Sequence, residues 1–278
     1  MALYIQTNVS ALEAEANFNE TQSQLNTSFS KLSSGYRINS AADDAAGLGI
    51  AKNMNAQVVS YTVAAQNSND AINMVQTADS AANQVDALLT RMRQLAVEAQ
   101  NGTMSSSDVA NLNTEFQQDL AEINRVAQDT TFNGSPLLSS STAGATFNVS
   151  FQVGIYGSTS DQIGVTFGGV DTAGLNLTGA SVTADGAGNN ILTTIDNALQ
   201  TLNTQRAGFG AAMNRLQYAA ASDQAQGNNL SSALASIQDV DVASETASLA
   251  REQVLAQAGA SVLSQANQSP QLALKLLG

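Results

Sequence analysis

The residues of this sequence that could carry chemistry are carboxylates, because the 278-residue chain has no His, no Cys and no Trp. Without His and Cys it cannot build zinc sites of thiolates and imidazoles, thiol nucleophiles or histidine acid–base catalysts. Asp43 and Asp44 are adjacent but lack the further oxygen ligands that a metal ion needs. They precede a helical pattern, where carboxylates stabilise a helix N-terminus. The same interpretation applies to Asp239 and Asp241, and we expect no catalytic, cofactor or metal site.

A Gly-rich stretch at 164–188 has no Lys at the spacing of a phosphate-binding loop. Residues 134–188 contain three isolated acids, Asp161, Asp171 and Asp185. An enzyme that used paired carboxylates would need these acids to converge on a pocket, and we keep it as an alternative of a different class.

The charge balance excludes several partners. Ten Lys and Arg residues stand against 23 Asp and Glu residues, for a net charge of −13. The basic residues are scattered, so we expect no nucleic-acid partner and no binding to anionic membrane surfaces. No stretch approaches the roughly 18 apolar residues of a membrane span, and we expect no membrane insertion. Residues 1–8 lack a basic start and an apolar run, so we expect no secretory signal peptide.

A long apolar stripe between residues 191 and 262 indicates how the chain is organised. The spacing alternates between three and four residues, which suits either an amphipathic helix or a coiled-coil seam. Ordinary surface helices rarely exceed about 25 residues, so the length favours the seam. A heptad pattern of matching length runs from residue 50 to residue 99 and could be its partner. The C-terminal stripe includes Leu192, Ile195, Leu199, Leu202, Phe209, Met213, Leu216, Leu230, Leu234 and Ile237.

Both ends of the chain carry weaker apolar stripes that would bury little area alone. We expect them to be ordered only against a partner, and Pro270 to end the last helix. The apolar positions near the N-terminus are Ile5, Val9, Leu12, Phe18, Leu25 and Leu32. Those near the C-terminus are Val254, Leu255, Val262 and Leu263.

The middle of the chain has a different character. Thr130 to Leu138 contains Asn133-Gly134 and Pro136 and is expected to be a turn. Apolar residues then alternate at Phe147, Val149 and Phe151, and again at Ile163, Val165 and Phe167, which indicates two strands. We therefore predict a mainly α fold. Long antiparallel coiled-coil helices from both termini would form a rod, with a small β-hairpin segment inserted near residues 140–185.

Several ordered motifs resemble one known family. They include Leu32-Ser33-Ser34-Gly35-Tyr36-Arg37-Ile38-Asn39-Ser40-Ala41, Asp43-Asp44-Ala45-Ala46-Gly47, Gln66-Asn67-Ser68-Asn69-Asp70-Ala71-Ile72, Met92-Arg93-Gln94-Leu95-Ala96-Val97 and Phe132-Asn133-Gly134. Toward the C-terminus they include Ala207-Gly208-Phe209-Gly210-Ala211, Asn229-Leu230-Ser231-Ser232-Ala233 and Gln257-Ala258-Gly259-Ala260-Ser261-Val262-Leu263. The chain closely resembles bacterial flagellins over roughly residues 1–155 and 190–278. Ala42 departs from the Lys that relatives often carry, and the middle is short.

The resemblance implies a domain organisation and a function. Residues 1–43 and 238–278 would form an inner helical coiled-coil domain, and residues 44–190 and 191–237 would form a rod domain. The function implied is that of a secreted structural subunit that polymerises with itself into the extracellular flagellar filament for motility. Such subunits leave the cell unfolded through the flagellar type III apparatus. A hook–filament junction protein, which shares the terminal helices, is the alternative.

The resemblance also implies partners and site residues. An Arg and a Leu of one helix and a Glu of the next contact Toll-like receptor 5 in flagellins that activate it. The matching positions here are Arg91, Leu95 and Glu115, with Met92 and Val97 beside them. Leu95 could equally be a seam residue and Arg91 a solvated one, and Gln94 replaces a common acid. Flagellar export chaperones cover a C-terminal segment that here holds Leu249, Val254, Leu255, Val262 and Leu263. The remaining implied partners are the filament cap and hook-junction proteins.

Overall fold

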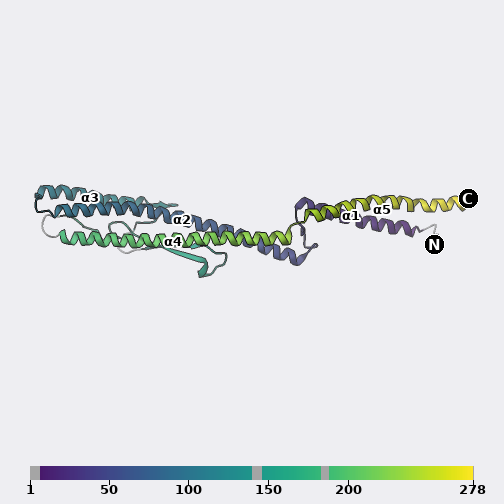
Figure 1. Ribbon diagram of the computed structural model, residues 1–278, viewed down its shortest axis with the longest axis horizontal. Helices are drawn as coiled ribbons and strands as arrows, with labels where there is room; N and C mark the ends of the chain where they lie inside the picture. Colours follow the sequence, from purple (N-terminus) through teal and green to yellow (C-terminus); the bar gives the residue numbers. More distant parts are fainter. Residues whose placement is uncertain (1–6, 140–145, 183–187, 278) are drawn as a thin grey trace. The chain divides into compact units, whose positions relative to one another are not determined.

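The computed structural model describes residues 7–139, 146–182 and 188–277, and the described chain is mainly helical (Figure 1). Its helices are α1 (Val9–Ser34), α2 (Ala45–Ala99), α3 (Ser106–Asp129), α4 (Gly188–Gln238) and α5 (Val242–Leu277). Its strands are β1 (Thr131–Phe132), β2 (Ser135–Pro136), β3 (Thr146–Gln152) and β4 (Gln162–Gly168), with a 3-10 turn, η1 (Thr159–Asp161), before β4. Long helices at both ends and a small antiparallel β segment between them confirm the predicted fold class.

The chain forms two compact units. The terminal unit comprises residues 1–56 and 229–278, and the central unit comprises residues 57–228. These compact units divide within α2 and α4, because each of these helices is longer than the stretch that packs in the central unit. The domain boundaries at 43/44 and 237/238 that the family resemblance implies stay a prediction.

The core of the central unit lies between α2, α3, α4 and the β segment. The heptad residues Val75, Ala82 and Leu89 of α2 are fully buried, and so are Ile195, Leu202 and Phe209 of α4. Phe209 also packs on Phe167 of β4, with ring centroids 5.4 Å apart. Two ion pairs, Arg206–Asp79 and Arg93–Asp196, join α4 to α2 outside this core. The predicted seam is therefore present as a packed, antiparallel pair.

Local capping fixes where α3 begins. The Ser105 hydroxyl accepts from the Asp108 backbone N–H, and the Asp108 carboxylate accepts from the Ser105 N–H at 3.1 Å. This reciprocal capping box is typical of helix starts. The Ser105 bonds hold the pKa of Asp108 below its ordinary value.

The β segment contains two antiparallel hairpins. The expected turn at Thr130 to Leu138 is itself a tight hairpin, β1–β2, with Asn133 and Gly134 both at positive φ. Asn-Gly is the dipeptide that such a turn favours. In the second hairpin β3 pairs with β4 in a register that sets Val149 against Val165. The alternation in β4 is confirmed, since Ile163, Val165 and Phe167 are buried.

The terminal unit consists of α1 and α5 side by side, with the first residues of α2 and the last of α4 (Figure 1). The two helices are antiparallel, because Asn8 at the start of α1 contacts Ala266 and Phe18 faces Gly259. The prediction that Pro270 ends the last helix was wrong, since α5 continues to Leu277. A proline inside a helix removes one N–H donor but does not always end the helix.

Candidate assembly surface

The ends of α1 are defined by one Asn and one Gly. The Asn8 side chain caps the helix by accepting from the Ala11 N–H at 3.2 Å. At the other end Gly35 adopts a left-handed conformation, with φ of 76°, and its N–H donates to the Lys31 carbonyl at 2.9 Å. Only Gly adopts this conformation without steric cost, so the Ser-Ser-Gly sequence ends α1 here.

The segment after α1 is held by the segment between α4 and α5. Val240 donates its backbone N–H to the Gly35 carbonyl at 3.0 Å, and Arg37 donates its own to Gln238 at 2.7 Å. Between these bonds Tyr36 forms an isolated antiparallel bridge with Asp239. The Arg37 guanidinium also donates to the Ile237 carbonyl. Residues about 200 positions apart are thus joined by backbone and side-chain bonds, which fixes where α1 and α5 leave this connection.

Asp43 and Asp44 serve the backbone next to this connection. The Asp43 carboxylate accepts from Ser40 N–H at 2.8 Å, from the Ser40 hydroxyl and from Asn39 N–H. These bonds, led by that of the Ser40 N–H, lower the pKa of Asp43. Asp44 accepts from Gly47 N–H at 2.9 Å and thereby caps α2. Asp44 thus acts at the helix start, as expected, whereas Asp43 stabilises the turn before the helix. No group of three or more potential metal-binding side chains occurs in the described parts of the chain.

The side chains predicted to pack in the assembled protein are poorly covered in the single chain. Val9 is 59% exposed and Val254 is 65% exposed, and Leu12, Leu255 and Val262 are also exposed. Phe18, Leu25, Leu32, Leu249 and Leu263 are half-buried. Ile5 lies outside the described residues. Among the described side chains of the terminal unit, those buried in the single chain are Ser28, Ile38 and Ala51.

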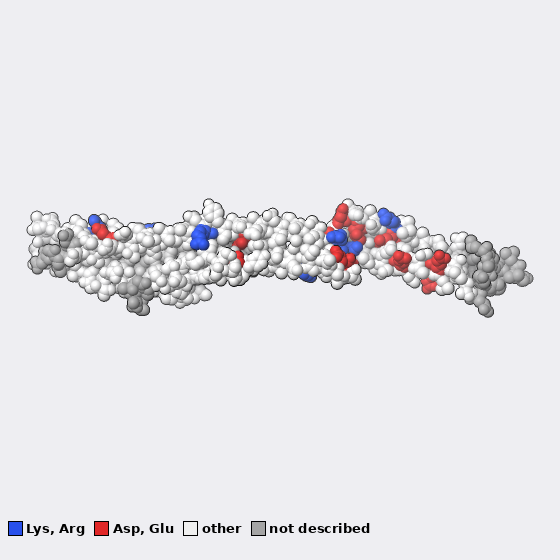
Figure 2. Space-filling model, turned by 90° about the horizontal axis from the view of Figure 1, so that it is seen from below, with Lys and Arg blue, Asp and Glu red and all other residues white. Residues whose placement is uncertain are grey.

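A shallow groove follows the seam between α1 and α5. Its volume is about 230 Å³, and it is lined by Ala14, Asn17, Phe18, Thr21, Leu255, Ala258, Gly259 and Val262. Gly259 allows the close approach of the two helices, because a β-carbon there would lie 3.3 Å from Phe18 Cδ2. The groove is mostly apolar, and none of the residues that line it is charged. Acidic side chains are visible on the surface of the same terminal unit (Figure 2).

The receptor-recognition candidates lie in α2 and α3 of the central unit. Arg91 and Glu115 form an exposed ion pair, with 2.6 Å between Arg91 Nη2 and Glu115 Oε1, which raises the pKa of Arg91. Val97 is 49% exposed. Met92 and Leu95 are fully buried in the core, so they can act only by supporting the surface above them. In the single chain Leu95 is a core residue, which agrees with its alternative interpretation as a seam residue.

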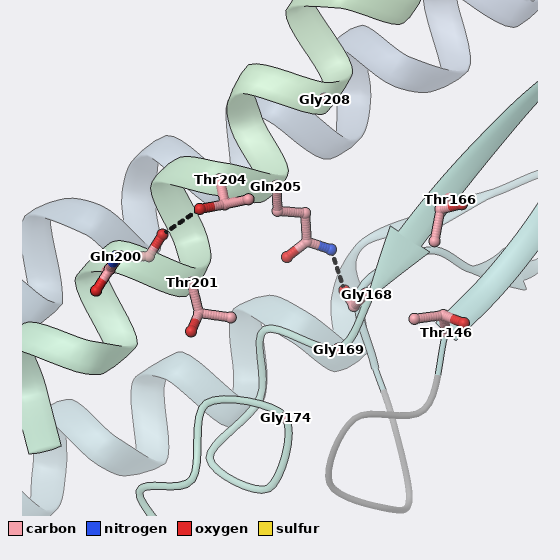
Figure 3. A pocket seen from close by; sticks show the side chains of 10 residues that line it. All are labelled: Thr146, Thr166, Gly168, Gly169, Gly174, Gln200, Thr201, Thr204, Gln205 and Gly208. Atoms are coloured by element: carbon pink, nitrogen blue, oxygen red, sulfur yellow. Dashed lines mark hydrogen bonds between the residues drawn. The ribbon is translucent and has the colours of Figure 1, made fainter.

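A second pocket, of about 580 Å³, lies between α4, the end of the β3–β4 hairpin and the loop after it (Figure 3). Its wall includes Thr146, Thr166, Gln200, Thr201 and several glycines, and no charged residue. Gln205 closes one side by donating from Nε2 to the Gly168 carbonyl at 2.6 Å. The described residues of its wall supply no carboxylate for acid–base chemistry.

Two of the three acids considered for an enzyme, Asp161 and Asp171, serve separate turns. Asp161 accepts from the Ser158 hydroxyl, and Asp171 accepts from Gly174 N–H, so both stabilise turns. Asp185 lies outside the described residues. The described helices contain no segment long and apolar enough to cross a membrane.

The comparisons with known proteins agree at both ends of the chain. Residues 5–143 match the family model described as the bacterial flagellin N-terminal helical region, and residues 192–277 match the C-terminal helical region. The chain belongs to the bacterial flagellin family. A flagellin of Halalkalibacterium halodurans is 36% identical over 275 residues, which cover 99% of this chain and 100% of the relative. The flagellar filament 33 kDa core protein of Treponema phagedenis is 33% identical, with coverage of 99% and 100%.

The solved structures add a likeness of fold. A Vibrio parahaemolyticus structure described as a flagellar hook-associated protein has a TM-score of 0.59 at 12% identity, covering 71% of this flagellin and 100% of that chain. At this identity the likeness shows the fold alone. A crystal structure of Bacillus cereus flagellin has 29% identity and a TM-score of 0.49, and covers 57% of this chain and 88% of that one.

Membership of the family establishes the role of this flagellin as a structural subunit of the bacterial flagellar filament, which is extracellular and built by self-polymerisation. The family motif from Leu32 to Gly47 corresponds to the bonded connection described above. Sequence reasoning identified these residues by resemblance but missed their partners, Gln238 and Val240. No local pattern could have linked segments so distant in the chain.

Proposed function

We propose that the terminal unit of this flagellin is the surface through which copies polymerise. One observation carries the proposal: α1 and α5 present large apolar side chains to solvent while burying few of their own. Exposed apolar surface of this kind marks interaction sites. Since the same unit occurs in every copy, a contact that does not close on itself produces a helical fibre.

The first test compares the full chain with a version lacking residues 1–33 and 240–278. Electron microscopy and sedimentation after seeding or salting out should find long filaments with the full chain only. Filaments formed by the truncated chain would contradict the proposed surface. A full chain that stopped at short rings would favour a hook–filament junction protein.

A point variant tests the same surface without removing a helix. Val254→Asp should raise the critical concentration for assembly at least tenfold, because an apolar side chain loses roughly 1.5–3 kcal/mol of burial in the contact. Gln253→Asp adds the same charge at the adjacent exposed position and is the control. Equal effects of the two substitutions would mean that charge, and not the apolar face, determines assembly.

Export and chaperone binding are proposed to use the same C-terminal face. The chain would leave the cell unfolded through the flagellar type III apparatus, which the absence of disulfide-forming residues permits. A flagellar export chaperone would cover Leu249, Val254, Leu255, Val262 and Leu263 before export, and polymerisation would cover them afterwards. The cap and hook-junction proteins would contact the same terminal helices at the two ends of the filament.

Recognition by Toll-like receptor 5 is proposed for the Arg91–Glu115 surface. Exposed Arg91, Glu115 and Val97 would contact the receptor, while buried Met92 and Leu95 would hold α2 in place. In a receptor-reporter assay, Arg91→Ala should reduce the response to dispersed protein. Arg125→Ala, which removes another exposed ion-paired Arg, is the control. No response to the unaltered chain would refute this part of the proposal alone.

A further inference from the structure

The oxygen and the nitrogen of the Asn8 side-chain amide each make a hydrogen bond. Its Oδ1 accepts from the Ala11 N–H and caps α1, while its Nδ2 donates to the Ala266 carbonyl of α5 at 2.8 Å. Asn carries the acceptor and the donor on two separate atoms, whereas a Ser or Thr hydroxyl has both on a single oxygen nearer the backbone and an Asp carboxylate has no donor. Asp, Ser or Thr could cap α1 equally well but could not supply the amide donor.

The Ala266 carbonyl needs this donor because of a residue four positions later. In an α-helix a carbonyl accepts from the N–H of residue i+4. For Ala266 that residue is Pro270, which has no N–H, although α5 continues through it to Leu277. A backbone carbonyl without a donor is costly when it is withdrawn from water, and Ala266 is half-buried. Asn8 provides the bond that Pro270 cannot.

We propose that Asn8 and Pro270 form a matched pair that sets the register of α1 against α5. The carbonyls inside a regular helix normally have their own N–H donors. The Ala266 carbonyl is therefore the one at which the Asn8 amide gains a hydrogen bond without displacing another. The start of α1 therefore docks at one level of α5. The bridge between Tyr36 and Asp239 holds the opposite end of the helix pair.

The register has a consequence for the apolar face. It decides which residues of α1 lie beside Val254, Leu255 and Val262, and hence the shape that a second copy meets. This consequence rests on the function proposed above, whereas the pairing of Asn8 with Pro270 can be tested without it.

The test is a double-mutant cycle in the full chain. Asn8→Ser keeps a cap for α1 but replaces the amide donor with a hydroxyl on a shorter side chain, and Pro270→Ala restores an N–H that Ala266 can accept from. Hydrogen exchange of peptides from α1, followed by mass spectrometry, is measured on the dispersed and the assembled protein. In the parent chain Asn8→Ser should reduce protection of α1 roughly fivefold, the effect of losing one hydrogen bond. In the Pro270→Ala background the same substitution should change it less than twofold.

Two results would overturn the pairing: an equal effect of Asn8→Ser in both backgrounds, or no protection of α1 in either state of the parent chain. Asn8→Asp is the second variant, and it should behave like Asn8→Ser if the amide donor is what matters. Sedimentation of the parent chain reports on polymerisation separately. A parent chain that does not polymerise would contradict the proposed function, while the exchange cycle still supports or overturns the pair.

Discussion

Gly47 and Gly49 are two residues apart in α2, yet their surroundings differ. A β-carbon at Gly47 would lie 2.3 Å from Asp44 Oδ2 and 2.8 Å from Ile38 Cδ1, whereas nothing lies within 4 Å of one at Gly49. Asp44 is held in place by its capping bond and Ile38 is only 2% exposed, so neither can move aside without loss. The glycine at 47 is therefore required by packing, and the glycine at 49 is not.

Alanine substitutions at these two sites should have opposite effects. Gly47→Ala should lower the free energy of unfolding of the terminal unit by about 1–2 kcal/mol, because the cap of α2 is lost and Ile38 is displaced. Gly49→Ala should raise it by up to about 1 kcal/mol, since Ala is the better helix former. Thermal melts followed by circular dichroism measure both. A shift of both melting temperatures in the same direction would contradict this difference between the two glycines.

Asp223 is a buried acid in α4 without a partner for one of its oxygens. It is 5% exposed, and among the described residues neither its Oδ2 nor the hydroxyl of buried Ser68 in α2 has a hydrogen-bond partner. Burial, followed by the negative charge of Asp161, raises the pKa of Asp223 above its ordinary value of 3.8. Tyr61 of α2 faces the same region, and burial raises its pKa too.

The sign of the pH dependence follows from this direction. An acid whose pKa is raised by folding leaves stability unchanged below the unfolded pKa and weakens the fold as pH rises through the folded pKa. Asp223→Asn should therefore raise the free energy of unfolding at pH 7 by about 1 kcal/mol, the order of cost of a buried unsatisfied group, and leave it unchanged in acid. Denaturant titrations across pH measure this. Asp70→Asn, at an exposed position of α2, is the control and should change little at any pH.

At the scale of helices, the register of α1 against α5 determines which pair of introduced cysteines can form a disulfide. An ideal β-carbon at Gly259 lies 3.9 Å from Phe18 Cβ, within the range that a disulfide spans. Because the natural chain has no Cys, the double variant Phe18→Cys, Gly259→Cys should form one intramolecular disulfide on mild oxidation. Electrophoresis without reductant measures the cross-linked fraction. Phe18→Cys with Ser261→Cys places the second thiol at an exposed position two residues away, and efficient cross-linking of that pair would contradict the register.

Periodicity predicted the helices well because it reports which face is buried. Periodicity alone was enough to predict the buried seam residues of α2 and α4 and the alternation of buried residues in β4. Contacts made by single polar atoms could not be found in this way, as the paired bonds of Asn8 illustrate. The prediction at Pro270 was wrong for a related reason. A helix can continue through a proline when a neighbouring segment donates a hydrogen bond to the carbonyl that the proline leaves without an N–H donor.

The sequence could predict which residues form the candidate site, but not how exposed each of their side chains is. The terminal apolar stripes were visible in the sequence, and the structure adds that Val9 and Val254 are exposed while Leu25 and Leu32 are half-buried. For the receptor candidates the same distinction separates Arg91 from Leu95, four residues apart on one helix. Burial on a helix depends on what packs against each face. For α2 that is set by α3 and by α4, and α4 lies far away in the sequence.

At the scale of the whole molecule, assembly brings together identical chains that each carry a net charge of −13. Both units contain more acidic than basic residues, so mutual repulsion opposes every new contact between copies. The apolar face of α1 and α5 must overcome this repulsion, and salt reduces it. Screening lengths fall from about 10 Å at 0.1 M ionic strength to about 3 Å at 1 M.

Raising the ionic strength from about 0.1 M to about 1 M should therefore lower the critical concentration for polymerisation, as measured by sedimentation at fixed pH. The same change should have a smaller effect on a variant with fewer acids on the exposed side of α1, such as Glu13→Gln with Glu15→Gln, because part of the repulsion has already been removed. If salt instead raised the critical concentration in both proteins, attraction between opposite charges would hold the copies together. The apolar terminal unit would then not be the dominant contact.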